Sequence, residues 1–364
     1  NRQKGVEDPA LGSKWWKTGA NKTYKASLRH VFSDKFMMEA QYAHIGNNFV
    51  LDFHDPALAA VQPSNETVTG AWDRSFNASQ FVRPTNSFDL TGTKSSSGFL
   101  GGDHAIKFGV RYRQDRAIST NHRGGNVEAR WKDTNGDAIF QSSEAIEANI
   151  YRDQYTDYNL FDQAAYIQDT FTRGKLTAQV GLRFDRQWNL TNQSVVGATP
   201  FYGQTTRTGL AFNQLPAITF PGAETGVKFT DIVPRLGLNW DANGDGRTVI
   251  KTSYARYAGQ LGDGELSQRL NPVGATLVRY PWADLNGDKF VQPNEIDISG
   301  APLSQSSGYD YRDPKALKTF GRIDPNITSE KTNEFILGFN RQFTRTFAMG
   351  ISGIYRKYTN FNWS

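Results

Sequence analysis

The chain has 364 residues, of which 13% are aromatic and 34 are glycine, and it has no cysteine. The lack of cysteine excludes a disulfide framework and thiolate metal sites, and the net charge of +5 is scattered without a basic block that could bind nucleic acid. No run of 18 apolar residues occurs, which excludes a transmembrane helix. This composition favours a β-rich protein with many turns.

Alternation of apolar and polar residues predicts ten strands. In the first segment, Tyr24, Ala26 and Leu28 alternate with Lys25 and Ser27, which gives the strand one apolar and one polar face. The same pattern recurs along the chain. The predicted strands are 23–33, 36–46, 87–99, 105–115, 157–171, 175–188, 229–241, 247–258, 330–343 and 346–358.

The connections between these strands alternate strictly between short and long. Short turns occupy 34–35, 100–104, 172–174, 242–246 and 344–345, and long polar loops occupy 47–86, 116–156, 189–228 and 259–329. A membrane barrel has short periplasmic turns and long outer loops, whereas a soluble sandwich or propeller mixes its loop lengths. Strands of about 11 residues can also cross the hydrocarbon layer when tilted. The predicted fold class is therefore all-β, an antiparallel transmembrane β-barrel with about ten strands present and long extracellular loops.

Aromatic residues at the strand ends support this prediction. They lie beside the short turns, where an interfacial girdle belongs: Phe32, Phe36, Phe99, Phe171, Trp240, Phe343 and Phe347. A soluble β-sandwich, with these rings capping its core, is the alternative. Charges that recur on the second face of so many strands favour a barrel with a wet interior.

Two segments of the long loops have the spacing of a calcium-binding loop, which supplies oxygen ligands from positions one, three, five, seven, nine and twelve. In "DLNGDKFVQPNE" these are Asp284, Asn286, Asp288, Phe290 through its carbonyl, Gln292 and Glu295. In "DTNGDAIFQSSE" they are Asp133, Asn135, Asp137, Ile139 through its carbonyl, Gln141 and Glu144. We therefore expect Ca²⁺ at both loops, as a clip that stiffens a long outer loop. A solvated acidic turn is the alternative at each.

Both loops depart from the calcium motif at position six, which holds Lys289 or Ala138 in place of glycine. No amphipathic helix precedes either loop, so a switching helix pair is not expected. A third copy, "DANGDG" at 241–246, lacks the acidic twelfth residue. Asp, Asn and Gly are ordinary turn formers, so turn chemistry alone explains that copy.

Three stretches resemble barrel segments of TonB-dependent outer-membrane receptors, especially the Oar-like branch. They are "FDQAAYIQDTFTRGKLTAQVGLRFDRQ" at 161–187, "DIVPRLGLNWDANGDGRTVIKTSYARYAGQ" at 231–260 and "TSEKTNEFILGFNRQF" at 328–343. The resemblance covers most of the predicted strands and little of the loops. It implies a ligand-gated importer with a 22-stranded barrel, an N-terminal plug domain and a TonB box.

The chain departs from that pattern because it shows no plug, TonB box or signal peptide. We therefore expect residues 1–364 to be a section of a larger 22-stranded barrel; a self-contained ten-stranded barrel is the rival. The expected location is the bacterial outer membrane, with the loops exposed at the cell surface. The expected partners are membrane lipid, an unknown external ligand and, where the full-length protein has them, a plug domain and the TonB complex.

No enzyme activity is predicted. The five histidines form no HExxH pair, and neither a nucleophilic serine elbow nor a phosphate-binding loop occurs. The leading hypothesis is a TonB-dependent receptor that transports a ligand. A surface structural or adhesion barrel that transports nothing is the alternative, and an omptin-like surface protease is a distant third.

Overall fold

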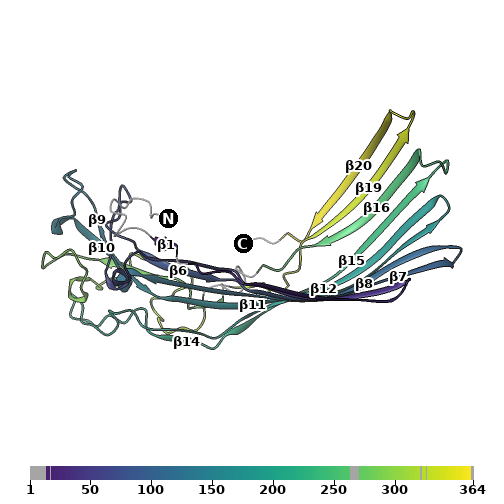
Figure 1. The fold of residues 1–364 in the computed structure, drawn as a ribbon. Helices are drawn as coiled ribbons and strands as arrows, with labels where there is room; N and C mark the ends of the chain where they lie inside the picture. The colour runs from purple at the N-terminus through teal and green to yellow at the C-terminus, as the bar shows by residue number, and fades with distance from the viewer. Residues whose placement is uncertain (1–13, 17, 263–269, 320–321, 325, 362–364) are drawn as a thin grey trace.

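The structure, a computed structural model, describes residues 14–16, 18–262, 270–319, 322–324 and 326–361. Within them the fold is all-β, with short 3₁₀ turns (Figure 1). The elements are β1 (Lys14–Trp16), β2 (Thr23–Ser33), β3 (Phe36–Ile45), β4 (Asn48–Phe53), η1 (Pro56–Ala60), β5 (Ser64–Glu66), β6 (Asn77–Val82), β7 (Thr85–Phe99), β8 (Gly102–Arg123), η2 (Gly124–Asn126), β9 (Val127–Trp131), η3 (Ser142–Glu144), β10 (Ala145–Arg152), β11 (Gln154–Arg173), β12 (Leu176–Thr191), β13 (Ser194–Val196), β14 (Ile218–Phe220), β15 (Ala223–Asp241), β16 (Thr248–Ala258), β17 (Thr276–Pro281), η4 (Pro293–Glu295), β18 (Ser304–Gln305), β19 (Lys331–Gln342) and β20 (Ala348–Thr359).

One large antiparallel sheet forms the body of the molecule. Its long strands pair in the order β2-β3-β7-β8-β11-β12-β15-β16-β19-β20. These are the ten strands that the alternation predicts. At the end of β8 remote from the short turns, β6 pairs with β8, β4 with β6 and β1 with β4, so the sheet has 13 strands in all.

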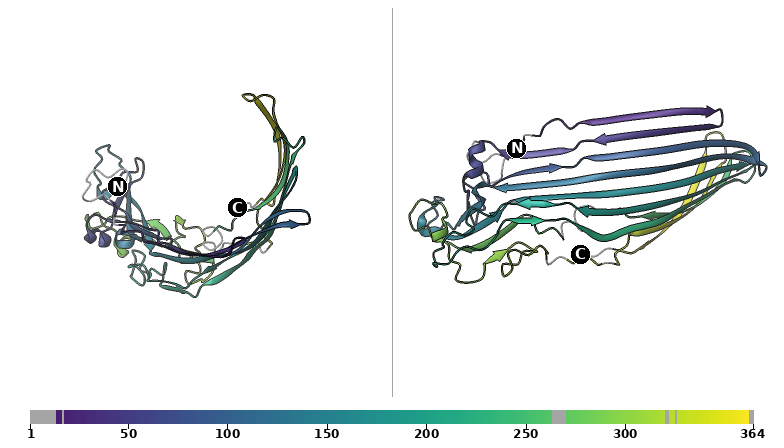
Figure 2. Two further views of the ribbon diagram at one scale, coloured as in Figure 1. Left: turned by 45° about the vertical axis from the view of Figure 1, so that its right-hand side comes forward. Right: turned by 90° about the horizontal axis from the view of Figure 1, so that it is seen from below.

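The sheet is an open trough (Figure 2). Among the described residues β2 pairs only with β3, β1 only with β4, and β20 only with β19, so these strands are its edges. Neither a closed barrel nor the expected 22 strands is present in this part of the chain. No helix in the described ranges is long and apolar enough to cross a membrane.

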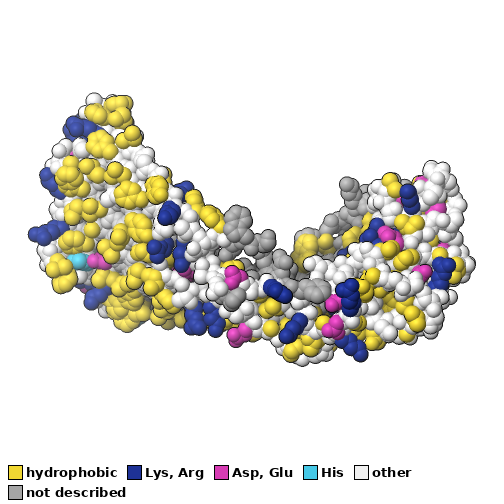
Figure 3. Space-filling model, turned by 180° about the vertical axis from the view of Figure 1, so that it is seen from behind, with side chains coloured by type: hydrophobic (Ala, Val, Ile, Leu, Met, Phe, Trp, Pro, Cys, Tyr) yellow, Lys and Arg dark blue, Asp and Glu magenta, His cyan; other side chains and the backbone are white. Residues whose placement is uncertain are grey.

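Strand register collects the apolar side chains on one face of the sheet. Directly paired residues from β2 to β15 form one row across seven strands: Leu28, Ala40, Leu90, Val110, Ala165, Phe184 and Ile232. A second row runs on to the last strand: Val180, Leu236, Tyr254, Phe335 and Tyr355. Much of this surface is open, since Leu28 is 72% and Ile232 57% exposed. Figure 3 shows apolar side chains gathered over the end of the sheet with the short turns.

The opposite face carries ion pairs between neighbouring strands. Arg29 lies 2.7 Å from Glu39, Arg111 lies 2.6 Å from Asp89, and Arg356 lies 2.5 Å from Glu334. Each pair joins residues directly opposite in register, where unlike charges stabilise a sheet by roughly 0.2–1 kcal/mol. The sheet therefore has one apolar and one charged face, as the alternation predicts.

Aromatic rings mark the short-turn end. Phe32 stacks on Phe36 at 5.0 Å and Phe343 lies 5.7 Å from Phe347, each pair flanking one turn. Phe99 and Phe171 both contact the ring of His104. These rings lie where the sequence predicts an interfacial girdle.

The strands extend further at the other end than the alternation predicts. β8 continues to Arg123 and β11 begins at Gln154, and β4 and β6 prolong the lines of β3 and β7. The region 116–156 is therefore partly strand. The apolar row stops before this end, because Arg116 and Asp157, which share strand parity with Val110 and Ala165, form an ion pair there. A pattern of hydrophobicity could not reveal strands that hydrogen bonding alone continues.

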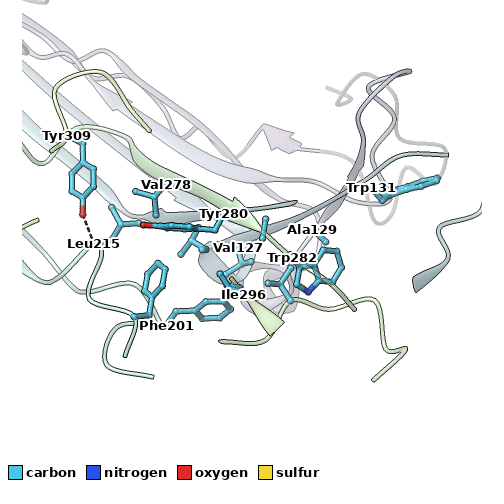
Figure 4. Close-up of a cluster of buried hydrophobic side chains, with 14 of the residues drawn as sticks. Val127, Ala129, Trp131, Phe201, Leu215, Val278, Tyr280, Trp282, Ile296 and Tyr309 are labelled. Carbon is cyan, nitrogen blue, oxygen red and sulfur yellow. Dashed lines mark hydrogen bonds between the residues drawn. The ribbon is translucent and has the colours of Figure 1, made fainter. Parts of the chain in front are cut away.

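The long loops pack into a layer with its own core. A second sheet runs in the order β18-β17-β10-β9-β5. Its buried side chains, including Val127, Ile150 and Val278, pack against Phe212 and Leu215 from the region 199–215. Figure 4 shows this cluster, with the Tyr309 hydroxyl accepting a hydrogen bond of 3.0 Å from the Leu215 N–H. The loops are thus a folded unit.

Part of the longest loop, 259–329, folds back over the charged face. Leu261 packs with Leu160, Val227 and Phe229, and its N–H donates to Gln187 Oε1 at 2.9 Å. The far end of the same loop returns to this face, where Ser329 Oγ donates to Asp231 Oδ2 at 2.6 Å. Phe229 and Asp231 have the strand parity of the charged face, since they pair with Gln187 and Asp185. The loop therefore narrows the space inside the trough.

His122 attaches the loop that contains Ala59 to the end of β8 remote from the short turns. Its Nδ1 lies 2.8 Å from Asp153 Oδ1 and its Nε2 lies 2.9 Å from the carbonyl oxygen of Ala59. Both neighbours are acceptors, and only an imidazolium can donate to both. The Asp153 carboxylate is the main cause that raises the pKa of His122, against the effect of burial, and the Ala59 carbonyl and the charge of Asp52 add to it.

The raised pKa gives the attachment a pH dependence. The stabilisation is fully present below the unfolded pKa of about 6.5 and is lost as pH rises through the folded pKa. We predict that amide hydrogen exchange in residues 54–63 accelerates when pH rises through this range, after correction for intrinsic exchange. In His122→Gln the corrected rates should not change with pH. His30→Gln is the control, and identical pH profiles for His122→Gln and the unaltered protein would contradict the attachment.

The two faces of the sheet predict opposite responses to one substitution. Val180 belongs to the apolar face, and the adjacent Gln179 points to the other face. The apolar face is expected to contact lipid, where a lysine near the bilayer midplane costs about 2–4 kcal/mol. Val180→Lys should lower the free energy of unfolding in phospholipid bilayers by that amount, measured with guanidinium and tryptophan fluorescence. Gln179→Lys should change it by less than about 1 kcal/mol, and equal losses would show that the faces are not distinct.

Candidate functional site

The two calcium-like segments lie in the loop layer and have one architecture. Segment 133–144 follows β9 and ends in η3, and segment 284–295 follows β17 and ends in η4. Both 3₁₀ turns carry a capping box between the glutamine at position nine and the glutamate at position twelve.

The aspartate at position one organises each segment through backbone N–H groups. Asp133 accepts from Gly136 N at 2.7 Å and from Ala138 N at 3.0 Å. Asp284 accepts from the equivalent Gly287 N at 2.9 Å and Lys289 N at 3.1 Å. The N–H groups of positions four and six therefore point toward the aspartate in both segments and hold its carboxylate in place.

Position six has a left-handed backbone in both segments. Its φ is 58° at Ala138 and 67° at Lys289, a conformation that costs a residue with a Cβ roughly 1–2 kcal/mol relative to glycine. The sequence departs from the glycine of the motif, but the structure keeps the backbone that the glycine would serve.

The carboxylate at position five is surrounded by donors. Asp288 accepts from Phe290 N at 2.8 Å and from the side-chain amides of Asn286 and Gln292 at 3.0 and 2.6 Å. The other copy repeats this, with Asp137 accepting from Ile139 N and from the amides of Asn135 and Gln141. The Ile139 N–H is the main cause that lowers the pKa of Asp137. Burial acts to raise the pKa of Asp288, but the Phe290 N–H and the amides lower it overall.

The glutamate at position twelve is buried in both segments, Glu144 at 2% and Glu295 at 1% exposure. Glu295 accepts from Leu285 N, Gln292 N and Trp282 Nε1 at 2.8–3.1 Å. Glu144 accepts from Thr134 N at 2.8 Å and Gln141 N at 3.1 Å. These N–H groups replace water around a carboxylate that would otherwise be costly to bury.

The residue types present are the oxygen donors that a hard cation prefers, and in the structure their side chains hydrogen-bond one another. In the described ranges no cluster of three His, Cys, Asp or Glu side chains is poised to bind metal. The sequence-predicted ligands at positions three, five and nine do come together, around Asp137 and around Asp288. A rotation of the side-chain amides at positions three and nine about their last bond would point an oxygen, in place of the N–H, toward the space beside the position-five carboxylate.

The two segments also contact each other, which sequence reasoning missed. Ser142 Oγ donates to Asp284 Oδ2 at 2.6 Å, and Lys289 Nζ lies 6.0 Å from the centre of the Phe140 ring. Phe140 and Val291, at position eight of each segment, are buried in one hydrophobic cluster. Residues about 150 positions apart give no local sign of such a pairing.

Gln62 holds the second segment in place. Its Nε2 donates to the Val291 carbonyl at 2.9 Å and its Oε1 accepts from the Val291 N–H at 2.9 Å. The side chain thus hydrogen-bonds to Val291 as a neighbouring strand would. The third copy, 241–246, is the turn between β15 and β16, where Asp241 accepts from Gly244 N and Gly246 N, so its turn chemistry is as the sequence predicts.

A sequence model described as the outer membrane beta barrel domain matches residues 8–356 of the chain. No curated protein matches it.

Proposed function

Because the chain belongs to the outer membrane beta barrel domain family, we propose that it is the barrel wall of a TonB-dependent receptor that takes up an external ligand. Membership of this family implies the bacterial outer membrane as its location. The proposal adds lipid around the apolar face, a plug domain and the TonB complex as partners, loops exposed at the cell surface, and no enzyme activity.

The observation that carries the proposal is the loop 259–329 folded over the charged face. A transporter needs a wet interior whose mouth is shaped to select a ligand, and Leu261 and Ser329 fasten this loop to that interior. The buried residues of the loop layer add a packed rim. An adhesion barrel needs its loops to extend away from the membrane, so inward folding favours transport.

Uptake by cells tests this directly. Three strains are compared: one that carries the gene, one in which it is deleted, and one that lacks TonB. Mass spectrometry measures which compounds each strain accumulates from a uniformly ¹³C-labelled cell extract. We predict at least one compound whose uptake falls at least tenfold in both mutant strains and on addition of a protonophore. Equal uptake by all strains, with surface attachment lost on deletion, would instead establish the adhesion barrel.

We also propose that the paired segments bind calcium and stiffen the loop layer. The oxygen-bearing side chains gathered around Asp137 and Asp288, and the buried Glu144 and Glu295, support this. Position six is strained and Lys289 places a positive charge at the second segment, so weak sites of the extracellular kind are expected.

Calcium titration of the full chain in detergent should give a Kd of roughly 10⁻⁴–10⁻³ M. Glu144→Gln and Glu295→Gln should each abolish one site, and Ala138→Gly should tighten the first by relieving its backbone. Trypsin cleavage after Lys289 should slow with calcium and accelerate with chelator, while the sheet stays folded. Asp245→Asn in the third copy is the control. An absence of binding heat, with cleavage indifferent to chelator, would reject calcium.

A further inference from the structure

A cavity of about 430 Å³ lies between β11 and the inward-folded loop. It is bounded by Gln154, Thr156 and Tyr158, which share strand parity with Asp162 on the charged face, and by the region 307–319. The cavity therefore opens on the inner side of the sheet at the long-loop end. Its volume lies in the range of pockets for small molecules.

Arg152 supplies an uncompensated positive charge at one wall. It is 2% exposed, and its Nη1 and Nη2 donate to the carbonyl oxygens of Pro216 and Pro272 at 3.0 and 2.9 Å. Its Nε has no partner, and both Nη atoms are taken by carbonyl oxygens in place of a carboxylate. Burial lowers the pKa of this guanidinium. A buried cation without a counterion attracts an anionic group into adjoining space.

Asp310 and Asp313 supply negative charge in the same cavity. Burial raises the pKa of Tyr309 to about 12. The charge of Asp310 also raises this pKa, and the charge of Arg152 lowers it. Its own hydroxyl is committed to Leu215 N and Gln214 Oε1. Lys318 also lines the cavity, so the walls carry two positive and two negative groups. Such walls suit a ligand with both charges better than a simple anion.

We propose that this cavity binds a small zwitterion, an amino acid or short peptide, with its carboxylate toward Arg152 and its ammonium group toward Asp310 and Asp313. This assignment rests on the proposed function, for which it names the ligand class. Arg152 acts mainly through its field, because its Nη atoms are already bound to protein carbonyls.

Equilibrium dialysis of the full chain in detergent tests the proposal. The probe is a mixture of the twenty amino acids and the short peptides of a casein digest, and mass spectrometry measures what the protein retains. We expect at least one zwitterion to be enriched, and enrichment to fall at least tenfold in Arg152→Gln and in Asp310→Asn/Asp313→Asn. Asp34→Asn, in the turn at the opposite end of the sheet, is the matched control and should bind as the unaltered protein does.

Two outcomes would overturn the proposal. One is the absence of any compound that the unaltered protein retains more than the aspartate double variant, which stays informative even where Arg152→Gln loosens the loops. The other is undiminished binding of the N-acetylated or C-amidated form of the retained compound, each of which lacks one charge. Dialysis needs neither TonB nor energy, so failed binding is distinguishable from failed uptake by cells.

Discussion

The register between strands is the constraint on which the rest of the structure depends. A shift of one residue in any pairing would move a whole strand's apolar side chains to the charged face. Instead the row from Leu28 to Ile232 keeps one side across seven strands, and cross-strand pairs such as Arg111 with Asp89 keep the other. The apolar face suits hydrocarbon, and the charged face can remain wet.

That division explains the placement of the loops. Beyond the apolar row the strands continue through hydrogen bonds, and the long loops bury residues against one another, around Ile150 and Val278, instead of against the sheet. Part of loop 259–329 does pack on the large sheet, where Leu261 contacts apolar side chains of the inner face, Leu160, Val227 and Phe229. The cavity beside Arg152 results from this inward folding.

Local sequence was enough for the ten long strands. Period-two alternation located all ten long strands of the wall. The spacing of Asp284 to Glu295 predicted calcium ligands, and those at positions three, five and nine lie together, while calcium itself stays a prediction. Features that depend on residues far apart in the sequence could not be predicted. They are the contact of Ser142 with Asp284, the hydrogen bonds of Gln62 to Val291, and the cavity. The polar ends of β8 and β11 were missed because they bury hydroxyl and amide side chains, which carry no alternating signal.

The sidedness of the sheet is tested most directly by single-cysteine scanning of β12, which the absence of native cysteine permits. Each position from 177 to 184 is replaced in turn, spin-labelled in phospholipid bilayers, and measured for collision with oxygen and with a polar nickel chelate. The two-faced sheet predicts strict alternation, with 178, 180, 182 and 184 favouring oxygen and 177, 179, 181 and 183 favouring the chelate. Equal accessibility along the strand, or the opposite phase, would contradict it.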